Sequence, residues 1–116
     1  MGYSKQNGKW ADTRDVNLSP AAALAVDTIS DVHEIGDRAS VRLTLDVTAV
    51  SSADTLDVTI ETSRDGVTWY AAGTFTQVTA ISTQRKLFLI DRFIRANYDV
   101  GGSAILIAFT LQGEAV

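Results

Sequence analysis

Few residues of this sequence have the chemistry that catalysis or metal binding usually requires. His33 is the single histidine, and the chain contains no cysteine. A nucleophile activated by a neighbouring base would depend on His33 alone, and no serine lies in a G-x-S-x-G turn that would present it to such a base. Zinc sites built from thiolates or from histidine pairs are excluded by the same counts. We interpret His33 as an ordinary exposed loop residue.

The carboxylates offer two further possibilities, and both have a simpler interpretation. Asp46, Asp57 and Glu61 are expected on the outward face of one hairpin, where two carboxyl groups could in principle hydrolyse a glycosidic bond. Outward acids also keep a sheet soluble and discourage edge pairing, and no pattern indicates a catalytic cleft. The acidic loop at residues 31–37 lacks the D-x-D-x-D-G spacing of a calcium loop. The sequence therefore predicts a protein that is not an enzyme and that has no metal or other cofactor.

Aromatic side chains could form a platform for a sugar ring, and Trp69 and Tyr70 are the evident candidates. Adjacent residues of a strand point to opposite faces of the sheet. Because Trp69 belongs to the apolar set of its segment, we expect it in the core. Tyr70 then remains available for contact with a partner.

Length and composition predict one globular domain built from β-strands. The chain has 116 residues, of which 46% are hydrophobic and 21% charged, and many are Thr or Val, which favour a pleated sheet. The net charge of −4 argues against nucleic acid or an anionic membrane as a partner, because both attract clustered Lys and Arg. No apolar run approaches the roughly 18 residues that span a bilayer. The absence of cysteine fits folding in a reducing cytoplasm.

The first 20 residues differ from the rest of the chain. Residues 1–20 are polar and follow neither a period of 2 nor one of 3.6, which predicts an extended arm before a domain at residues 21–116. A tryptophan in such a tail gains little unless it docks, either on its own domain or on a neighbour. We predict that the arm binds a partner, and the acid-rich residues 31–65 of an identical subunit offer one suitable surface. The predicted partner-binding residues are Tyr3, Lys5, Lys9, Trp10 and Arg14 in the arm and Tyr70 in the domain.

Alternation of apolar and polar residues predicts the first strands of the domain. Residues 22–29 are expected to form a strand and residues 30–40 a loop. Residues 41–50 and 56–61 alternate strictly and are expected to pair as a hairpin. Their inward residues are Val41, Leu43, Leu45, Val47 and Ala49, and then Leu56, Val58 and Ile60.

A turn is predicted at residues 63–66, with Gly66 at a positive φ. The register that follows places Thr62 opposite Val67 and Ile60 opposite Trp69. One apolar face then continues across the turn.

The remaining strands complete an all-β fold. A short strand is expected at residues 74–80, with a bulge because Phe75 and Val78 differ in parity. Strands follow at residues 85–90, 93–100 and 104–111, and the last of them is expected to be central and buried on both faces. About eight short strands favour an antiparallel β-sandwich, jelly-roll or Ig-like, with a small barrel as the alternative. The expected inner residues are Ile94, Ala96, Tyr98, Val100, Ile105, Ile107, Phe109 and Leu111.

The stretch LDVTIETSRDGVTWYAAGTFTQVT, followed by DRFIRANYDVGG and a final apolar strand, resembles a group of small β-sandwich proteins. These proteins are encoded among the virion structural genes of tailed bacteriophages. The resemblance covers residues 40–112 and leaves the arm outside. The residues that carry it are Leu56, Asp57, Val58, Ile60, Ser63, Asp65, Gly66, Trp69, Phe75, Gln77, Val78, Arg92, Phe93, Ile94, Arg95 and Ala96.

The resemblance implies a structural protein of the virion, made in the host cytoplasm. Its implied partners are other virion proteins, the major capsid protein first among them, and it would form a homo-oligomer. Our leading hypothesis is that it decorates or cements the capsid. A component of the neck or tail and a carbohydrate-binding or adhesion module are the alternatives. The matching motifs specify hairpins and a core, so the resemblance transfers no catalytic or ligand residue.

Overall fold

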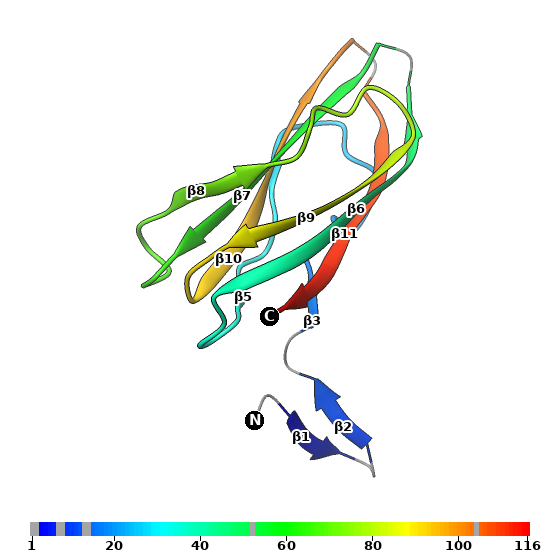
Figure 1. The fold of residues 1–116 in the computed structure, drawn as a ribbon. Helices are drawn as coiled ribbons and strands as arrows, with labels where there is room; N and C mark the ends of the chain where they lie inside the picture. Colours follow the sequence, from blue (N-terminus) through cyan, green and yellow to red (C-terminus); the bar gives the residue numbers. More distant parts are fainter. Residues whose placement is uncertain (1–2, 7–8, 13–14, 52, 104) are drawn as a thin grey trace.

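In a computed structural model, the chain forms an all-β fold of two facing antiparallel sheets (Figure 1). The structure describes residues 15–51, 53–103 and 105–116, and it describes residues 3–6 and 9–12 by their backbone. Within these residues there are eleven strands and no helix. The predicted fold class, an antiparallel β-sandwich, is confirmed.

The first sheet has four strands in the order β3-β11-β6-β9. β11 and β6 lie in the middle, whereas β3 and β9 form the two edges. The strands are β3 (Asp15–Asn17), β11 (Ile107–Ala115), β6 (Ser40–Val50) and β9 (Ser82–Leu89).

The second sheet has five strands, and its main path is β4-β10-β7-β8. The short strands β4 and β5 both pair with β10, on the side opposite β7. The strands are β4 (Thr28–Ile29), β5 (His33–Glu34), β10 (Phe93–Gly101), β7 (Thr55–Ser63) and β8 (Tyr70–Thr74).

The core lies between the two sheets and consists of alternate residues of the long strands. Most of the expected inward residues are buried there, and Val100 and Ile105 are partly buried against them. Ala49 is the exception and is exposed. The register between β6 and β11 shifts next to Ala108, because Phe109 pairs with Val47 while Ala108 pairs with Ala49. This bulge reverses the alternation after Val47.

Tyr98 is a core residue with a polar partner. Its side chain is fully buried, and its hydroxyl donates a hydrogen bond to the carbonyl oxygen of Leu18. Its ring meets that of Phe109 edge-on, with 4.9 Å between the centroids. Burial raises the pKa of the Tyr98 hydroxyl, so the group stays protonated and remains a donor. Tyr98 thereby fixes the segment after β3 to the second sheet.

The predicted hairpin of residues 41–50 and 56–61 is wrong. β6 and β7 belong to different sheets, and the chain crosses from one to the other between the end of β6 and the start of β7. Two strands that face each other across a core show the same apolar alternation as two strands that pair side by side. The pattern alone therefore did not distinguish the two arrangements.

The N-terminal boundary also differs from the expectation. Residues 15–17 form β3, which pairs with β11, and Val16 and Leu18 are buried in the core. The predicted arm is thus shorter than 20 residues. Before β3 in the chain, β1 (Tyr3–Gln6) and β2 (Lys9–Asp12) pair as a separate two-stranded sheet, where an extended arm without a folded element was expected. Figure 1 shows this pair outside the sandwich, beyond the start of β3.

Three shorter predictions need correction as well. Within residues 22–29 only β4 is a strand, although Leu24 makes an isolated bridge to Ile107. The expected loop at 30–40 contains β5. Residues 74–80 form no strand beyond the end of β8, and Val78 makes an isolated bridge to Leu56.

The last strand is central but is covered on one face only. β11 lies between β3 and β6, as expected of a central strand. Thr110 and Gln112 are nevertheless exposed on its outer side. The expectation of burial on both faces was wrong because it relied partly on Ile105 and Leu106, which precede the pairing of β11.

Candidate binding surfaces

The turn between β7 and β8 is organised by the side chains of Ser63 and Asp65. The Ser63 hydroxyl oxygen accepts a hydrogen bond from the backbone N–H of Gly66 at 2.9 Å. One carboxylate oxygen of Asp65 accepts bonds from the N–H groups of Val67 and Thr68, at 2.8 and 2.9 Å. Gly66 has a φ of 79°, which confirms its predicted conformation.

The bonds to Asp65 also affect its titration. The N–H group of Thr68 lowers the pKa of the Asp65 carboxyl most, and that of Val67 lowers it next, because both stabilise the charged form. A lowered pKa in the folded state means that the carboxylate stabilises the fold above the ordinary value of 3.8. That contribution is lost as the pH falls through the lowered pKa.

The predicted register after the turn is wrong. Thr62 lies opposite Tyr70, and Ile60 lies opposite Gly73. The connection spans residues 64–69, because Asp65 binds two further N–H groups and so extends the turn beyond Gly66. The register also shifts between Ile60 and Glu61, which the sequence pattern did not indicate.

Trp69 lies outside the core, contrary to the prediction. Its side chain is half-buried, and the guanidinium of Arg95 lies 4.1 Å from the centroid of its ring. The Nε atom of Arg95 donates to a carboxylate oxygen of Glu61 at 2.7 Å. Arg95 and Glu61 are paired residues on the outer face of β10 and β7, with side chains only 23% and 19% exposed. Trp69, Arg95 and Glu61 therefore form a stack on the outside of the five-stranded sheet.

This position changes the expected effect of replacing Trp69. Substitution of alanine for Trp69 should lower the free energy of unfolding by about 2 kcal/mol, because it removes a cation–π contact and the burial of a half-buried ring but no volume between the two sheets. Urea denaturation monitored by circular dichroism would measure the change. A loss of roughly 3 kcal/mol or more would instead be typical of a core aromatic side chain.

Tyr70, the predicted partner-binding residue of the domain, is 46% exposed at the start of β8. Its strand partner Thr62 is buried and belongs to the inward set of β7, whereas Trp69 stacks on the outer face. Trp69 and Tyr70 thus do not form one flat platform. Binding of a partner by Tyr70 remains a prediction.

The predicted partner-binding residues of the arm are placed only in part. Lys5 and Trp10 are paired positions of β1 and β2, Tyr3 begins β1, and Lys9 begins β2. Their side chains, and Arg14 altogether, lie outside the described residues. Binding of a partner by these residues remains a prediction.

The carboxylates that could have formed a catalytic set are separated. Asp57 and Glu61 lie on β7, whereas Asp46 lies on β6 in the other sheet and accepts a hydrogen bond from the Thr83 hydroxyl at 3.0 Å. The expectation that the three acids share one face was wrong, because it depended on the incorrect hairpin. They cannot act on one bond.

A different acidic cluster is formed by Asp27, Asp57 and Asp99. Asp99 and Asp57 are directly opposite each other on β10 and β7. Asp27 hydrogen-bonds to the side chain of Asp99 and accepts the N–H of Val100 at 2.9 Å. The pKa of Asp99 is raised above its usual value of 3.8, mainly by the hydrogen bond from Asp99 to Asp27. Repulsion from the charges of Asp27 and Asp57 contributes less.

This cluster predicts a pH-dependent stability. The folded state binds the Asp99 proton more tightly than the unfolded state does. The contribution of Asp99 to the stability of the fold is therefore complete below pH 3.8 and is lost as the pH rises through the raised pKa. Replacing Asp99 with asparagine should therefore raise the melting temperature at neutral pH. The gain should disappear near pH 3, which is about one unit below the unperturbed value. The exposed loop variant Asp37→Asn, which removes the same charge, is the control. Equal gains in both variants would assign the effect to net charge.

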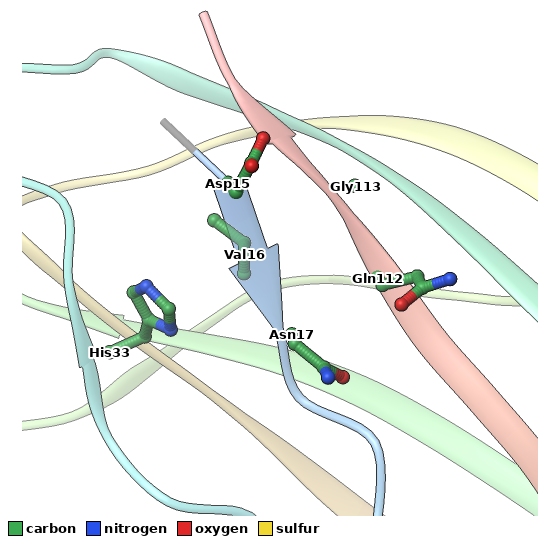
Figure 2. A pocket seen from close by; sticks show the side chains of 6 residues that line it. All are labelled: Asp15, Val16, Asn17, His33, Gln112 and Gly113. Atoms are coloured by element: carbon green, nitrogen blue, oxygen red, sulfur yellow. The ribbon is translucent and has the colours of Figure 1, made fainter. Parts of the chain in front are cut away.

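A hollow lies between β3, β11 and β5. It has a volume of about 430 Å³ and is shallow and open. Figure 2 shows the ring of His33 on one side of β3 and Gln112 on the other. His33 is half-buried on β5, where we expected an exposed loop residue. The lining residues are Asp15, Val16, Asn17, His33, Gln112 and Gly113.

Within the part of the chain that the structure describes, no group of three or more His, Cys, Asp or Glu side chains is arranged to hold a metal ion. The same residues include no helix that is long and apolar enough to cross a membrane. No protein-family model matches the chain, and a search of curated proteins found no match.

The sequence reasoning missed the stack of Trp69, Arg95 and Glu61. Its signal lay in the outward positions of Glu61 and Arg95, which could be combined only once β7 and β10 were known to pair. The distribution of charge over the four-stranded sheet was also missed. That distribution also depends on strand order, because β3, β11, β6 and β9 come from distant parts of the sequence.

Proposed function

We propose that this chain is a non-enzymatic structural protein of a tailed-phage virion, which decorates or cements the capsid. In this proposal the sandwich is the rigid body, and residues 1–14 bind a neighbouring virion protein, with the major capsid protein as the first candidate. We propose this class of protein because residues 40–112 resemble small virion proteins of tailed phages.

One observation carries the proposal: β1 and β2 form a sheet of their own that pairs with neither sheet of the sandwich. A two-stranded hairpin is at best marginally stable in water when it stands alone. Packing against a neighbouring protein would stabilise it and would add main-chain hydrogen bonds at its edges. A partner would thus stabilise residues 1–14 more than it would stabilise the body.

The body suits repeated weak binding. Its core joins both sheets through fully buried side chains such as Leu43, Leu45 and Ile60, so it can transmit a fixed orientation to an attached segment. Identical subunits on a symmetric shell add many weak contacts into one stable assembly. Such a protein needs no deep pocket, and the hollow between β3, β11 and β5 is open and shallow.

Deletion of residues 1–14 tests the proposal. Because β3 begins at Asp15, the deletion leaves both sheets intact, and the melting temperature should stay nearly unchanged. Co-sedimentation with purified capsids should fall to background. The matched control replaces residues 1–14 with a flexible Gly/Ser chain of equal length, which keeps the tether and removes its side chains. Binding of the full-length protein should weaken as salt rises from about 0.05 to about 0.5 M, because exposed charge pairs are screened.

Two results would contradict the proposal. If the deleted variant co-sediments with capsids as well as the full-length protein, residues 1–14 are not the binding segment. If the full-length protein binds no capsid, neck or tail component, the virion assignment itself fails.

A carbohydrate-binding module is the second candidate, and the position of Trp69 outside the core favours it. A sugar ring could stack on an indole whose other side is held by Arg95. A glycan array comparing the wild-type protein with Trp69→Ala tests this candidate. Binding that is lost in the variant would support it, and no binding by the wild type would remove it.

A further inference from the structure

The outer face of the four-stranded sheet divides its charge between two halves. On the half formed by β3 and β11, the outward charged residues are Asp15 and Glu114; on the half formed by β6 and β9 they include Arg42 and Arg85. Asp46, also on β6, is hydrogen-bonded to Thr83 further along the strands. One half of the face is therefore acidic and the other carries the two arginines.

Strand register places these residues in two neighbouring rows across the sheet. One row contains Asp15, Glu114, Arg42 and Leu87, because each is the strand partner of the next. The adjacent row contains Arg85, which is the partner of Thr44. Arg42 and Glu114 are 3.7 Å apart, with side chains 61% and 42% exposed. This pair is accessible and can accept further charged partners.

The same face is hollowed between its two halves. Asp15, Arg42, Arg85 and Glu114 all line a hollow of about 340 Å³, together with Thr44 and Gly113. Beside it Leu87 and Leu89 project from the edge strand β9 and are 56% and 77% exposed. Exposed leucines next to paired charges are typical of a surface that a partner covers.

We propose that this face binds the same face of a second copy of the chain, around a two-fold axis parallel to the strands. Rotation about such an axis exchanges the two halves, so that the arginines of each copy lie over the acids of the other. Arg42 then faces Glu114, and Arg85 reaches Asp15, twice per dimer. A two-fold axis across the strands would instead place arginine over arginine and acid over acid, which is unfavourable.

The size of the face is typical of a weak, transient dimer. Strands about 4.8 Å apart with about 3.3 Å per residue give the four strands an area of roughly 500 Å² in each copy. The total, roughly 1,000 Å², is at the lower limit of specific interfaces, so we expect dissociation constants on the order of tens of micromolar. Many such contacts on a shell would add to the binding by residues 1–14 without replacing it.

Sedimentation equilibrium of single charge reversals tests the proposal. The wild type should dimerise at low salt and dissociate as salt rises to about 0.5 M. Arg85→Glu and Asp15→Lys, each alone, should weaken self-association roughly tenfold, because each places like charges together twice per dimer.

A mixture of the two variants provides a sharper test. An equimolar mixture should form a heterodimer, because the two reversed charges attract each other at one contact while the unchanged Asp15 and Arg85 meet at the other. Arg64→Glu, in the turn after β7 with a side chain 86% exposed, is the control and should dimerise as the wild type does.

Several outcomes would overturn the proposal. If the wild-type protein stays monomeric at a protein concentration about ten times the expected dissociation constant, it has no such interface. Dimerisation that survives Arg85→Glu would point to pairing along the edge of β9 instead. Failure of the mixed variants to associate would exclude the two-fold axis parallel to the strands. Melting temperatures of each variant establish that it is folded.

This inference and the proposed function can fail separately. Deletion of residues 1–14 leaves the face intact, so the deleted protein should still dimerise while it loses capsid binding. Loss of the dimer on deletion would overturn the face-to-face interface and leave the proposed role of residues 1–14 standing.

Discussion

Replacing Gly113 with alanine is expected to destabilise the sandwich by about 3 kcal/mol, at the upper end of the roughly 1–3 kcal/mol that overpacking usually costs. Gly113 lies in β11, between Val16 of β3 and Leu43 of β6. An ideal Cβ at this position would be 1.8 Å from the carbonyl oxygen of Arg42 and 3.0 Å from the Cα of Leu43. Both are backbone atoms of the neighbouring central strand, so no side-chain rotation can relieve the clash. The strands must separate, and their hydrogen bonds weaken with them.

Urea denaturation of Gly113→Ala beside Gly36→Ala would measure this effect. Gly36 has a φ of 65° and no atom within 4 Å of an ideal Cβ, so its substitution adds backbone strain without a clash. That strain costs roughly 1–2 kcal/mol. Equal stability losses in the two variants would mean that Gly113 does not pack against the backbone of β6.

Replacing Tyr98 with alanine is expected to lower the free energy of unfolding by roughly 3–5 kcal/mol, as for other large aromatic residues of a core. The side chain is fully buried between the sheets and is among the largest buried side chains of the protein. Its removal leaves a cavity beside Phe109 and also removes the donor that satisfies the Leu18 carbonyl.

Tyr98→Phe separates these two contributions. It keeps the ring and removes only the hydroxyl, so the Leu18 carbonyl loses its side-chain donor at a cost of roughly 1–3 kcal/mol. Hydrogen exchange should also show faster exchange at Val16 and Leu18, because the segment after β3 is no longer fixed to β10. A Phe variant as stable as the wild type would indicate that water replaces the Tyr98 hydroxyl.

The side-chain alternation of the long strands could be predicted from the sequence, because the two-residue period identifies the inward set whichever strand is the neighbour. The buried residues of β7 and β10 were predicted in this way. The conformation of Gly66 was predictable for a similar reason, since residues with a Cβ resist a positive φ.

Strand pairing could not be predicted, because it depends on contacts far apart in the sequence. β6 and β7 are adjacent in the chain and lie in opposite sheets, whereas β6 pairs with β11 and β7 pairs with β10. Trp69 was misplaced because the turn after β7 is longer than four residues, which changes the register between β7 and β8. Ion pairs such as Arg95 with Glu61, which are 34 residues apart, join distant strands, so no local pattern contains them.

The short strand β3 determines how the fold bears mechanical load. Asp15 lies beside Glu114, so the chain enters the sandwich next to its own C-terminus. If the two termini were pulled apart, the hydrogen bonds between β3 and β11 would open one after another.

A pull on residues 1–14 that is directed along β3 and away from the body would instead load those hydrogen bonds together in shear. It would also load the hydrogen bond from the Leu18 N–H to the Leu111 carbonyl and the one from the Tyr98 hydroxyl to the Leu18 carbonyl. Forced opening then requires the simultaneous loss of several hydrogen bonds, and its rate follows the unfolding barrier. In the proposed role, tension on residues 1–14 that is directed along β3 would therefore meet the more resistant of these two loading directions.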